Sequence, residues 1–134
     1  MSQNYTIIRN ERSGLVLDAR ETVLKILPFT GQPTQLWKLE SSGSGTIYIV
    51  NKANGKVLDI ESGIKNGNNI ITYSKKGSAN QQWIVNSDDT IVSSEQNLAI
   101  DIFEARCSPG NKIIIIIIII IIIIIIMSVM VNRQ

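Results

Sequence analysis

The sequence predicts an all-β fold in which three repeats close into a barrel. An aspartate-terminated pattern recurs at Asp18, Asp59 and Asp101, with spacings of 41 and 42 residues. Short runs of β-branched and aromatic residues alternate with turns rich in Gly, Asn and Ser, which is typical of strands. Threefold repetition favours a closed barrel, because closure removes most exposed sheet edges.

The repeats align without gaps over twelve residues. The aligned segments are IRNERSGLVLDA from Ile8, IVNKANGKVLDI from Ile49 and IVSSEQNLAIDI from Ile91. A second match lies downstream, where QLW begins at Gln35 and QQW begins at Gln81. A period of slightly over forty residues indicates one domain made of stacked structural units. We place that domain at 1–134 and its repeats at about 3–43, 44–86 and 87–134.

The middle repeat shows the expected elements most clearly. Its β-branched, leucine and aromatic content predicts strands at 47–50, 57–60, 70–73 and 83–85. Asn54-Gly55 predicts a type I′ hairpin turn, since both residues tolerate positive φ. Asn66-Gly67 predicts a second turn, and the basic pair Lys75-Lys76 is expected to be solvated on a third. Four strands in each of three repeats predict about twelve strands.

An unbroken run of isoleucine, residues 113–126, occupies part of the third repeat. When the third repeat is laid on the second, Ile124 falls on Gln81 and Ile126 on Trp83. We therefore expect the backbone of the run to follow a third repeat. About half of its side chains would then face water, because side chains alternate along a strand. The run is also a candidate for cross-β association.

An alternative is that residues 113–131 span a membrane as one helix, which would make the chain a tail-anchored membrane protein. The segment has nineteen residues, and Ser128 is the only polar one. That length is sufficient to cross a bilayer. The alternative leaves two-thirds of a barrel with open edges, so the sequence disfavours a membrane partner.

Composition excludes several classes of function. A formal net charge of +2 is too small to indicate a nucleic-acid partner. The chain has no histidine, which excludes histidine-based triads and metal sites. The single cysteine, Cys107, has no base to activate it. We expect no enzyme activity, cofactor or metal. The N-terminal residues lack a secretory signal pattern, which predicts a cytoplasmic protein or one exported by a non-classical route.

The QLW and QQW motifs, the second with GKVLDI upstream, resemble the Gln-x-Trp repeats of the ricin B-type lectins. The resemblance covers the whole chain and is strongest over residues 46–86. It implies a β-trefoil fold of three such units. It also implies non-enzymatic binding of carbohydrate on glycans or glycoproteins, usually through terminal galactose or N-acetylgalactosamine.

In the middle repeat the resemblance implies a carbohydrate-binding site made of Asp59, Tyr73, Asn80 and Gln81. Asp59 would accept two sugar hydroxyls through strong charge-assisted hydrogen bonds. Tyr73 would stack against the apolar C–H face of the sugar ring. Asn80 would bond a hydroxyl, and Gln81 would support Asp59 from behind. Ile71 stands where the family often has a polar residue, which predicts weaker binding or a shifted sugar preference.

The first repeat is predicted to be a degenerate site. It keeps Asp18 and Gln35, but Leu27 stands in place of the aromatic residue and Thr34 in place of the asparagine. A leucine offers no stacking face for a sugar ring.

The third repeat is also predicted to be degenerate. It keeps Asp101, but Ile116 and 123–124 replace the aromatic residue and the Asn-Gln pair. Phe103 is expected to lie in the core. With one competent site, strong binding to a glycan-bearing surface would require several copies of the chain, in a homo-oligomer or a fused assembly.

Two structural interpretations stand beside the lectin hypothesis. Trp37 and Trp83 are predicted to pack in the core, since large aromatic residues at a repeating position next to strands usually do. Each repeated aspartate could serve only to satisfy nearby backbone N–H groups. On that basis the chain would be a trefoil without sugar binding, a protein-interaction or inhibitor module that works through its loops.

Overall fold

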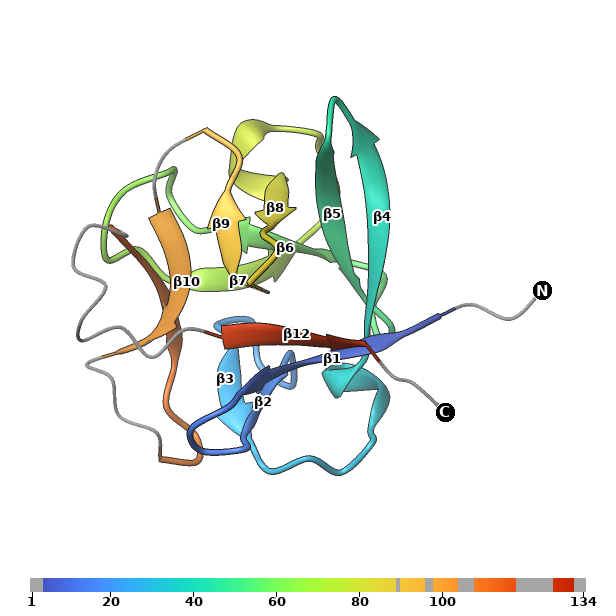
Figure 1. Cartoon of the computed structure of the whole chain (residues 1–134), viewed down its shortest axis with the longest axis vertical. Coiled ribbons are helices and arrows are strands. Elements are labelled where there is room, and N and C mark those ends of the chain that lie inside the picture. The colour runs from blue at the N-terminus through green and yellow to red at the C-terminus, as the bar shows by residue number, and fades with distance from the viewer. Residues whose placement is uncertain (1–3, 89, 96–97, 104–107, 118–126, 132–134) are drawn as a thin grey trace.

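A computed structural model of the chain describes residues 4–88, 90–95, 98–103, 108–117 and 127–131. Within these residues the fold is all β, with twelve strands and two short 3-10 helices (Figure 1). The strands and 3-10 helices, in chain order, are β1 (Thr6–Asn10), β2 (Val16–Asp18), β3 (Lys25–Leu27), η1 (Pro33–Gln35), β4 (Trp37–Gly43), β5 (Thr46–Asn51), β6 (Val57–Ile60), β7 (Ile70–Tyr73), η2 (Ala79–Gln81), β8 (Trp83–Val85), β9 (Ile91–Ser93), β10 (Leu98–Ile102), β11 (Ile113–Ile117) and β12 (Met127–Val131).

Six of the strands form the wall of a barrel. Antiparallel ladders join β12 to β1, β1 to β4, β4 to β5, β5 to β8 and β8 to β9. Strand β12 also contacts β9, which completes the circuit. The other six strands form three hairpins, β2–β3, β6–β7 and β10–β11. The chain thus passes through the same four-strand unit three times, and the fold is a β-trefoil, as the sequence predicts.

The three hairpins join one another at one end of the barrel. Isolated bridges pair Val23 with Ile71, Asn69 with Ile114, and Lys25 with Lys112. Each bridge links a different pair of hairpins, so every hairpin is bonded to the other two. Between the first and second hairpins, for example, the amide of Leu24 donates to the carbonyl of Ile70 at 2.9 Å. The hairpins therefore hold one another in place around a pseudo-threefold axis.

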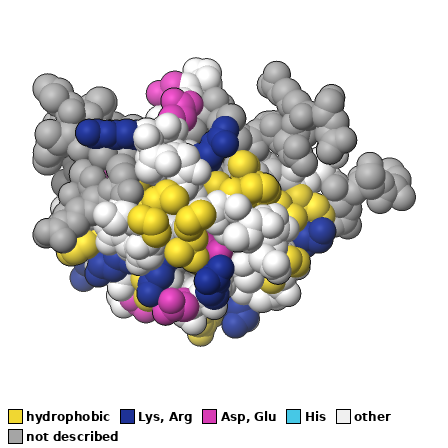
Figure 2. All heavy atoms as spheres, turned by 90° about the horizontal axis from the view of Figure 1, so that it is seen from below, with side chains coloured by type: hydrophobic (Ala, Val, Ile, Leu, Met, Phe, Trp, Pro, Cys, Tyr) yellow, Lys and Arg dark blue, Asp and Glu magenta, His cyan; other side chains and the backbone are white. Residues whose placement is uncertain are grey.

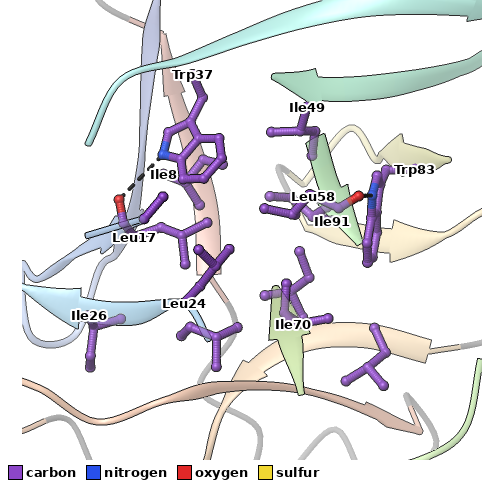
Figure 3. Packing of buried hydrophobic residues seen from close by; sticks show 14 of the residues in the cluster. Ile8, Leu17, Leu24, Ile26, Trp37, Ile49, Leu58, Ile70, Trp83 and Ile91 are labelled. Carbon is purple, nitrogen blue, oxygen red and sulfur yellow. Dashed lines mark hydrogen bonds between the residues drawn. The ribbon is translucent and has the colours of Figure 1, made fainter. Parts of the chain in front are cut away.

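The two tryptophans lie in the core at equivalent positions of the first two repeats, as predicted. Both are fully buried. Figure 3 shows each indole donating its N–H to a backbone carbonyl, Trp37 to Leu17 at 3.3 Å and Trp83 to Leu58 at 3.2 Å. A buried donor left without a partner is costly, so these bonds allow a polar ring to lie among aliphatic side chains.

The strands predicted in the middle repeat are confirmed, but one predicted turn is wrong. Asn54-Gly55 does not form a type I′ turn, because Gly55 alone of the two has positive φ, at 68°. The loop is longer than two residues. It is closed by the Gly55 amide on the Asn51 carbonyl at 2.9 Å, and by the Asn51 amide on the Lys56 carbonyl at 2.8 Å. A loop of this length needs only one residue in the left-handed region.

The described parts of the isoleucine-rich segment are strands. Residues 113–117 form β11, whose register places Ile114 opposite Asp101 and Ile116 opposite Ala99, as the repeat alignment predicts. Ile113, Ile114 and Ile115 are all buried, although alternation along a strand places the side chain of Ile114 on the opposite face from the other two. The bridge between Ile114 and Asn69 brings the neighbouring hairpin next to this position. The expectation that about half of the isoleucine side chains face water stays a prediction for the rest of the run. The equivalents of Gln81 and Trp83, at 124 and 126, lie outside the described residues.

Strands β11 and β12 occupy the two ends of residues 113–131, so this segment is not the single helix of the membrane alternative. Searching the described residues finds no helix with the length and apolarity needed to cross a membrane.

The surface of the described residues mixes polar and hydrophobic side chains. Figure 2 shows one face where hydrophobic side chains gather near the centre, with lysine, arginine and acidic side chains close by. Three large hydrophobic residues are exposed among the described residues: Phe29, Leu39 and Tyr73. The two aromatic rings among them are accessible to a ligand from solvent.

Candidate functional site

The β6–β7 hairpin presents Asp59 and Tyr73 on the same face. The antiparallel register pairs Asp59 with Ile71 and Val57 with Tyr73. Residues directly opposite each other, and alternate residues along one strand, share a face of the sheet. Asp59, Ile71 and Tyr73 therefore lie on the outer face, while the intervening Leu58 belongs to the core.

The carboxylate of Asp59 is held by two side-chain amides. Asn80 donates its Nδ2–H to Oδ1 at 3.1 Å, and Gln81 donates its Nε2–H to Oδ2 at 2.9 Å. The residue is only 6% exposed. A carboxylate oxygen can accept two hydrogen bonds, so each oxygen keeps one acceptor site beyond its amide. The group is thus oriented to accept two hydroxyl groups from a ligand.

Gln81 uses all of its hydrogen-bonding capacity inside the protein. Besides Asp59, its Nε2 donates to the Ser74 carbonyl at 2.9 Å. Its Oε1 accepts the backbone N–H of Lys76 at 2.7 Å and of Gly77 at 3.2 Å. The side chain is fully buried. Gln81 therefore fixes Asp59 to the following loop and has no polar atom left for a sugar.

Asn80 bridges Asp59 and its own loop. In addition to Asp59, its Nδ2 donates to the carbonyl of Ile60 at 3.2 Å. Its Oδ1 accepts the Ser78 hydroxyl at 2.6 Å. Both N–H donors are engaged, so the remaining acceptor site on Oδ1 is what this side chain can offer to a ligand hydroxyl.

Tyr73 provides an exposed aromatic ring beside the carboxylate, and 44% of the residue is accessible to solvent. The ammonium group of Lys76 lies over this ring, 4.6 Å from its centroid. Lys75 bonds Glu40 and lies over the ring of Tyr48. Both lysines are exposed, as expected for a solvated pair, but the contact between Lys76 and the ring of Tyr73 was not predicted from the sequence. A signal was present in its spacing, three residues after the aromatic.

Burial raises the pKa of the Asp59 carboxyl above its ordinary value. Hydrogen bonds from Gln81 and Asn80 and the positive charge of Lys76 oppose this rise, and the negative charge of Glu61 adds to it. Desolvation disfavours the charged form of an acid, and it is the largest of these effects. The anion that would accept sugar hydroxyls is therefore lost at a less acidic pH than for an ordinary aspartate.

The first repeat keeps the hydrogen bond between glutamine and aspartate but lacks the other parts of the candidate site. Gln35 donates to Asp18 Oδ2 at 3.0 Å, as Gln81 does to Asp59. The backbone N–H of Arg20 donates to Oδ1 at 2.7 Å, so each Asp18 oxygen accepts one hydrogen bond, as in Asp59, but the Asp18 side chain is fully buried. Leu27 pairs with Val16 as Tyr73 pairs with Val57. The first repeat thus has neither an accessible carboxylate nor an aromatic ring at this position.

The third repeat keeps a buried Asp101 opposite Ile114. Positions 123 and 124, predicted to replace the Asn-Gln pair, lie outside the described residues, as does Cys107. Phe103 is not part of the core cluster, which corrects the prediction. It is half-buried, and the ammonium group of Lys112 lies 4.6 Å from the centroid of its ring.

No group of three or more His, Cys, Asp or Glu side chains that could hold a metal occurs among the described residues.

The chain was compared with known families and proteins. The family model described as ricin-type β-trefoil lectin domain-like matches residues 1–73 and 33–116, which together cover most of the chain. No curated protein matches the chain by sequence.

Several solved structures share the fold. A designed threefold symmetric protein, ThreeFoil, is 26% identical, with 96% of this chain and 99% of that one covered and a TM-score of 0.82. The Macrolepiota procera ricin B-like lectin in complex with lactose is 15% identical, with 98% and 99% covered and a TM-score of 0.80.

An exo-β-1,3-galactanase from Clostridium thermocellum is 24% identical, with a TM-score of 0.82; 98% of this chain is covered, but only 31% of the galactanase. These structures share the three-repeat fold described above, and the family model matches more than half of the chain. The chain belongs to the ricin-type β-trefoil lectin domain-like family.

Proposed function

We propose that the chain is a non-enzymatic lectin that binds a terminal galactose or N-acetylgalactosamine of a glycan at Asp59. The observation that carries the proposal is the pair of amide hydrogen bonds, from Asn80 and Gln81, that fix the orientation of the largely buried Asp59 carboxylate. The same hairpin face carries the exposed ring of Tyr73. An acceptor pair beside an aromatic ring matches the two chemically distinct parts of a pyranose.

Each part of the sugar has a partner in this site. Two neighbouring hydroxyls would donate to the two oxygens of Asp59, and the charge on the acceptor strengthens both bonds. The C–H face of the ring would lie against Tyr73, which provides apolar contact. The lactose bound by the Macrolepiota procera lectin and the galactan cleaved by the Clostridium thermocellum enzyme support a galactose-type ligand.

The proposal assigns Asp59 to binding and not to catalysis. Both of its oxygens accept hydrogen bonds from amides that the fold holds in place. A shallow site with one acidic clamp should give about 4–5 kcal/mol of binding free energy, or roughly millimolar affinity. Useful binding to a glycan-bearing surface would then come from several copies of the chain acting together.

Isothermal titration calorimetry with lactose tests this proposal, with maltose as the control sugar because it ends in glucose. The wild-type chain should bind lactose, and Asp59→Asn should abolish binding while circular dichroism shows the same fold. Asp88→Asn is a matched control, since Asp88 is an exposed aspartate whose carboxylate accepts hydrogen bonds from Thr90. No binding of lactose or of any glycan on an array, or unchanged lactose binding by Asp59→Asn, would overturn the proposal.

A second candidate is a protein-interaction or inhibitor module that works through its loops. The exposed Phe29, on the loop between β3 and η1, favours it, since 55% of this aromatic residue is accessible to solvent. Exposed aromatic side chains are common anchors at protein interfaces. Failure on the glycan array, together with binding to a protein that Phe29→Ala abolishes, would favour this candidate over the lectin.

A further inference from the structure

A pocket of about 950 Å³ opens where the three hairpins meet, on residues separate from Asp59 and its amide partners. The bridges between hairpins place Val23, Asn69 and Lys112 at equivalent positions of the three repeats, and all three line the pocket. The pocket therefore lies by the pseudo-threefold axis. Its volume is within the range of sites that hold small ligands.

The lining of this pocket carries an excess of positive charge. It contains Arg20, Lys25 and Lys112 but one carboxylate, Glu21, which Lys25 binds at 3.0 Å. Among the described residues no carboxylate lies within 4.0 Å of the Lys112 ammonium. A pocket lined by one sign of charge concentrates ions of the opposite sign.

The positive charge of Arg20 is also only weakly compensated by nearby carboxylates. Its nearest acidic partner is Asp18, at 3.7 Å, and that carboxylate already accepts hydrogen bonds from Gln35 and from the backbone N–H of Arg20 itself. Glu61, near the lining, is held by Asn69 at 3.1 Å. Arg20 and Lys112 are therefore the two cations that can receive an anionic group.

Phe103 provides an aromatic surface next to one of these cations. The Lys112 ammonium lies 4.6 Å from its ring centroid. The two residues are also tied through their backbones. The Phe103 amide donates to the Lys112 carbonyl at 3.0 Å, and Asn111 donates from Nδ2 to the Phe103 carbonyl at 2.8 Å. Asn111 Oδ1 in turn accepts the Lys112 amide at 2.9 Å. The ring and the cation thus form a preorganised pair.

This pair is specific to the third repeat. The alignment of the three aspartates places Arg20 and Glu61 at the positions equivalent to Phe103. Only one side of the pocket therefore has an aromatic ring, and Arg20 and Phe103 are contributed by different repeats. A ligand that contacts both must carry an apolar face and an anionic group.

We propose that this pocket binds an acidic saccharide, a sugar bearing a carboxylate or a sulfate group. Its anionic group would pair with Arg20 and Lys112 and draw the Lys112 ammonium off the ring of Phe103, so that the C–H face of the sugar could lie against that ring. Hydroxyls would meet the polar groups of Thr22 and Asn69 in the lining. A simple inorganic anion would use the two cations and leave the aromatic ring without a role. The proposal does not depend on sugar binding at Asp59.

The test is an NMR titration of the full chain labelled with ¹⁵N, using glucuronic acid and glucose 6-sulfate as probes. Neutral glucose and sodium sulfate are the controls, all at matched ionic strength. We expect saturable shifts of the Gly110 and Lys112 amides with both acidic sugars. Glucose should cause no saturable shift, and sulfate should bind about tenfold or more weakly, because it lacks the ring contact.

Three variants distinguish the pocket from the Asp59 site. Lys112→Gln and Phe103→Leu should each weaken binding of the acidic sugars about tenfold, the scale for losing one charge-assisted or aromatic contact. Asp59→Asn and the surface control Lys56→Gln should leave it unchanged. Lys112→Gln alone decides the outcome if Phe103→Leu does not fold.

The proposal is wrong if glucose binds as well as the acidic sugars, if sulfate alone binds as tightly, or if Lys112→Gln leaves the affinity unchanged. It is also wrong if Asp59→Asn removes the shifts, because the acidic sugars would then be using the other site.

Discussion

Protonation of Asp59 should have opposite effects on the stability of the fold and on the proposed binding of lactose. Its pKa is raised in the folded chain, so the folded state takes up the proton at a higher pH than the unfolded state does. Protonation of Asp59 therefore favours folding as pH falls through its raised pKa towards the ordinary value. The proposed lactose binding requires the anion and should be lost over the same range.

The first prediction is that lactose affinity falls as the solution is acidified, with a midpoint above the ordinary range for aspartate. The physical reason is the burial of Asp59 beside a partly solvated ring. Calorimetric titrations from neutral to acidic pH measure the midpoint, and circular dichroism at each pH verifies the fold. A midpoint at or below the ordinary aspartate pKa would contradict the assignment of Asp59 as the acceptor.

The second prediction concerns Lys76, which lies over the ring of Tyr73. A neutral sugar that stacks on that face must displace the ammonium group, and an exposed cation–π contact is worth about 0.5–1 kcal/mol. Lys76→Ala should therefore raise lactose affinity by about two- to fivefold at neutral pH. It should also move the acid midpoint to higher pH, because a positive charge near Asp59 is removed.

Calorimetry on Lys76→Ala, with Lys56→Ala as a control lysine in the β5–β6 loop, measures both effects. Weaker binding by Lys76→Ala would show instead that the lysine contacts the sugar directly.

At the scale of the element, each hairpin repeats one backbone geometry while the side chains decide whether it binds. Val16 opposite Leu27 and Val57 opposite Tyr73 are the same position in two hairpins. The difference between them extends beyond the missing ring. Asp18 Oδ1 accepts the backbone N–H of Arg20, while Asp59 Oδ1 accepts the side-chain amide of Asn80.

The third prediction is that adding an aromatic ring to the first repeat does not create a second site. In Leu27→Tyr the ring would lie beside an Asp18 side chain that is fully buried and therefore out of reach of a sugar hydroxyl. Lactose should bind the variant with the stoichiometry and affinity of the wild-type chain. The converse change, Tyr73→Leu, should remove detectable binding. A second equivalent of lactose bound by Leu27→Tyr would show that Asp18 is accessible after all.

These hairpins also show what could be predicted from the sequence. The strands and the equivalence of Leu27 and Ile116 with Tyr73 follow from the aligned repeats, and the register confirms them. The burial of Ile114 and the partial burial of Phe103 could not be predicted in this way, because both residues lie where hairpins of different repeats meet. Contacts between distant segments of this kind leave no periodic signal in the sequence.

At the scale of the whole molecule, the site depends on the barrel through the Gln-x-Trp motif. Gln81 binds Asp59, and Trp83, two residues later, donates to the carbonyl of Leu58. The motif therefore attaches both the side chain of Asp59 and the backbone next to it to the core. Gln35 and Trp37 make the same two contacts with Asp18 and Leu17. The repeated motif is thus a structural clamp in both repeats, and the second repeat adds to it the proposed binding site.

The fourth prediction follows from that symmetry. Trp37→Ala and Trp83→Ala should each lower the free energy of unfolding by about 3–5 kcal/mol, since each removes a fully buried indole. Trp37→Phe and Trp83→Phe should cost less, because the ring remains and the main loss is one buried hydrogen bond, about 1–3 kcal/mol. Denaturant unfolding measures all four values.

Trp37→Phe and Trp83→Phe should have similar effects on stability but different effects on lactose affinity. Trp37→Phe should leave the affinity unchanged, because the first repeat has no accessible carboxylate. Trp83→Phe should weaken binding, because the released carbonyl of Leu58 adjoins Asp59. Equal effects of the two substitutions on lactose affinity would mean that the clamp stabilises the fold alone, and that the geometry of the site is set within the β6–β7 hairpin.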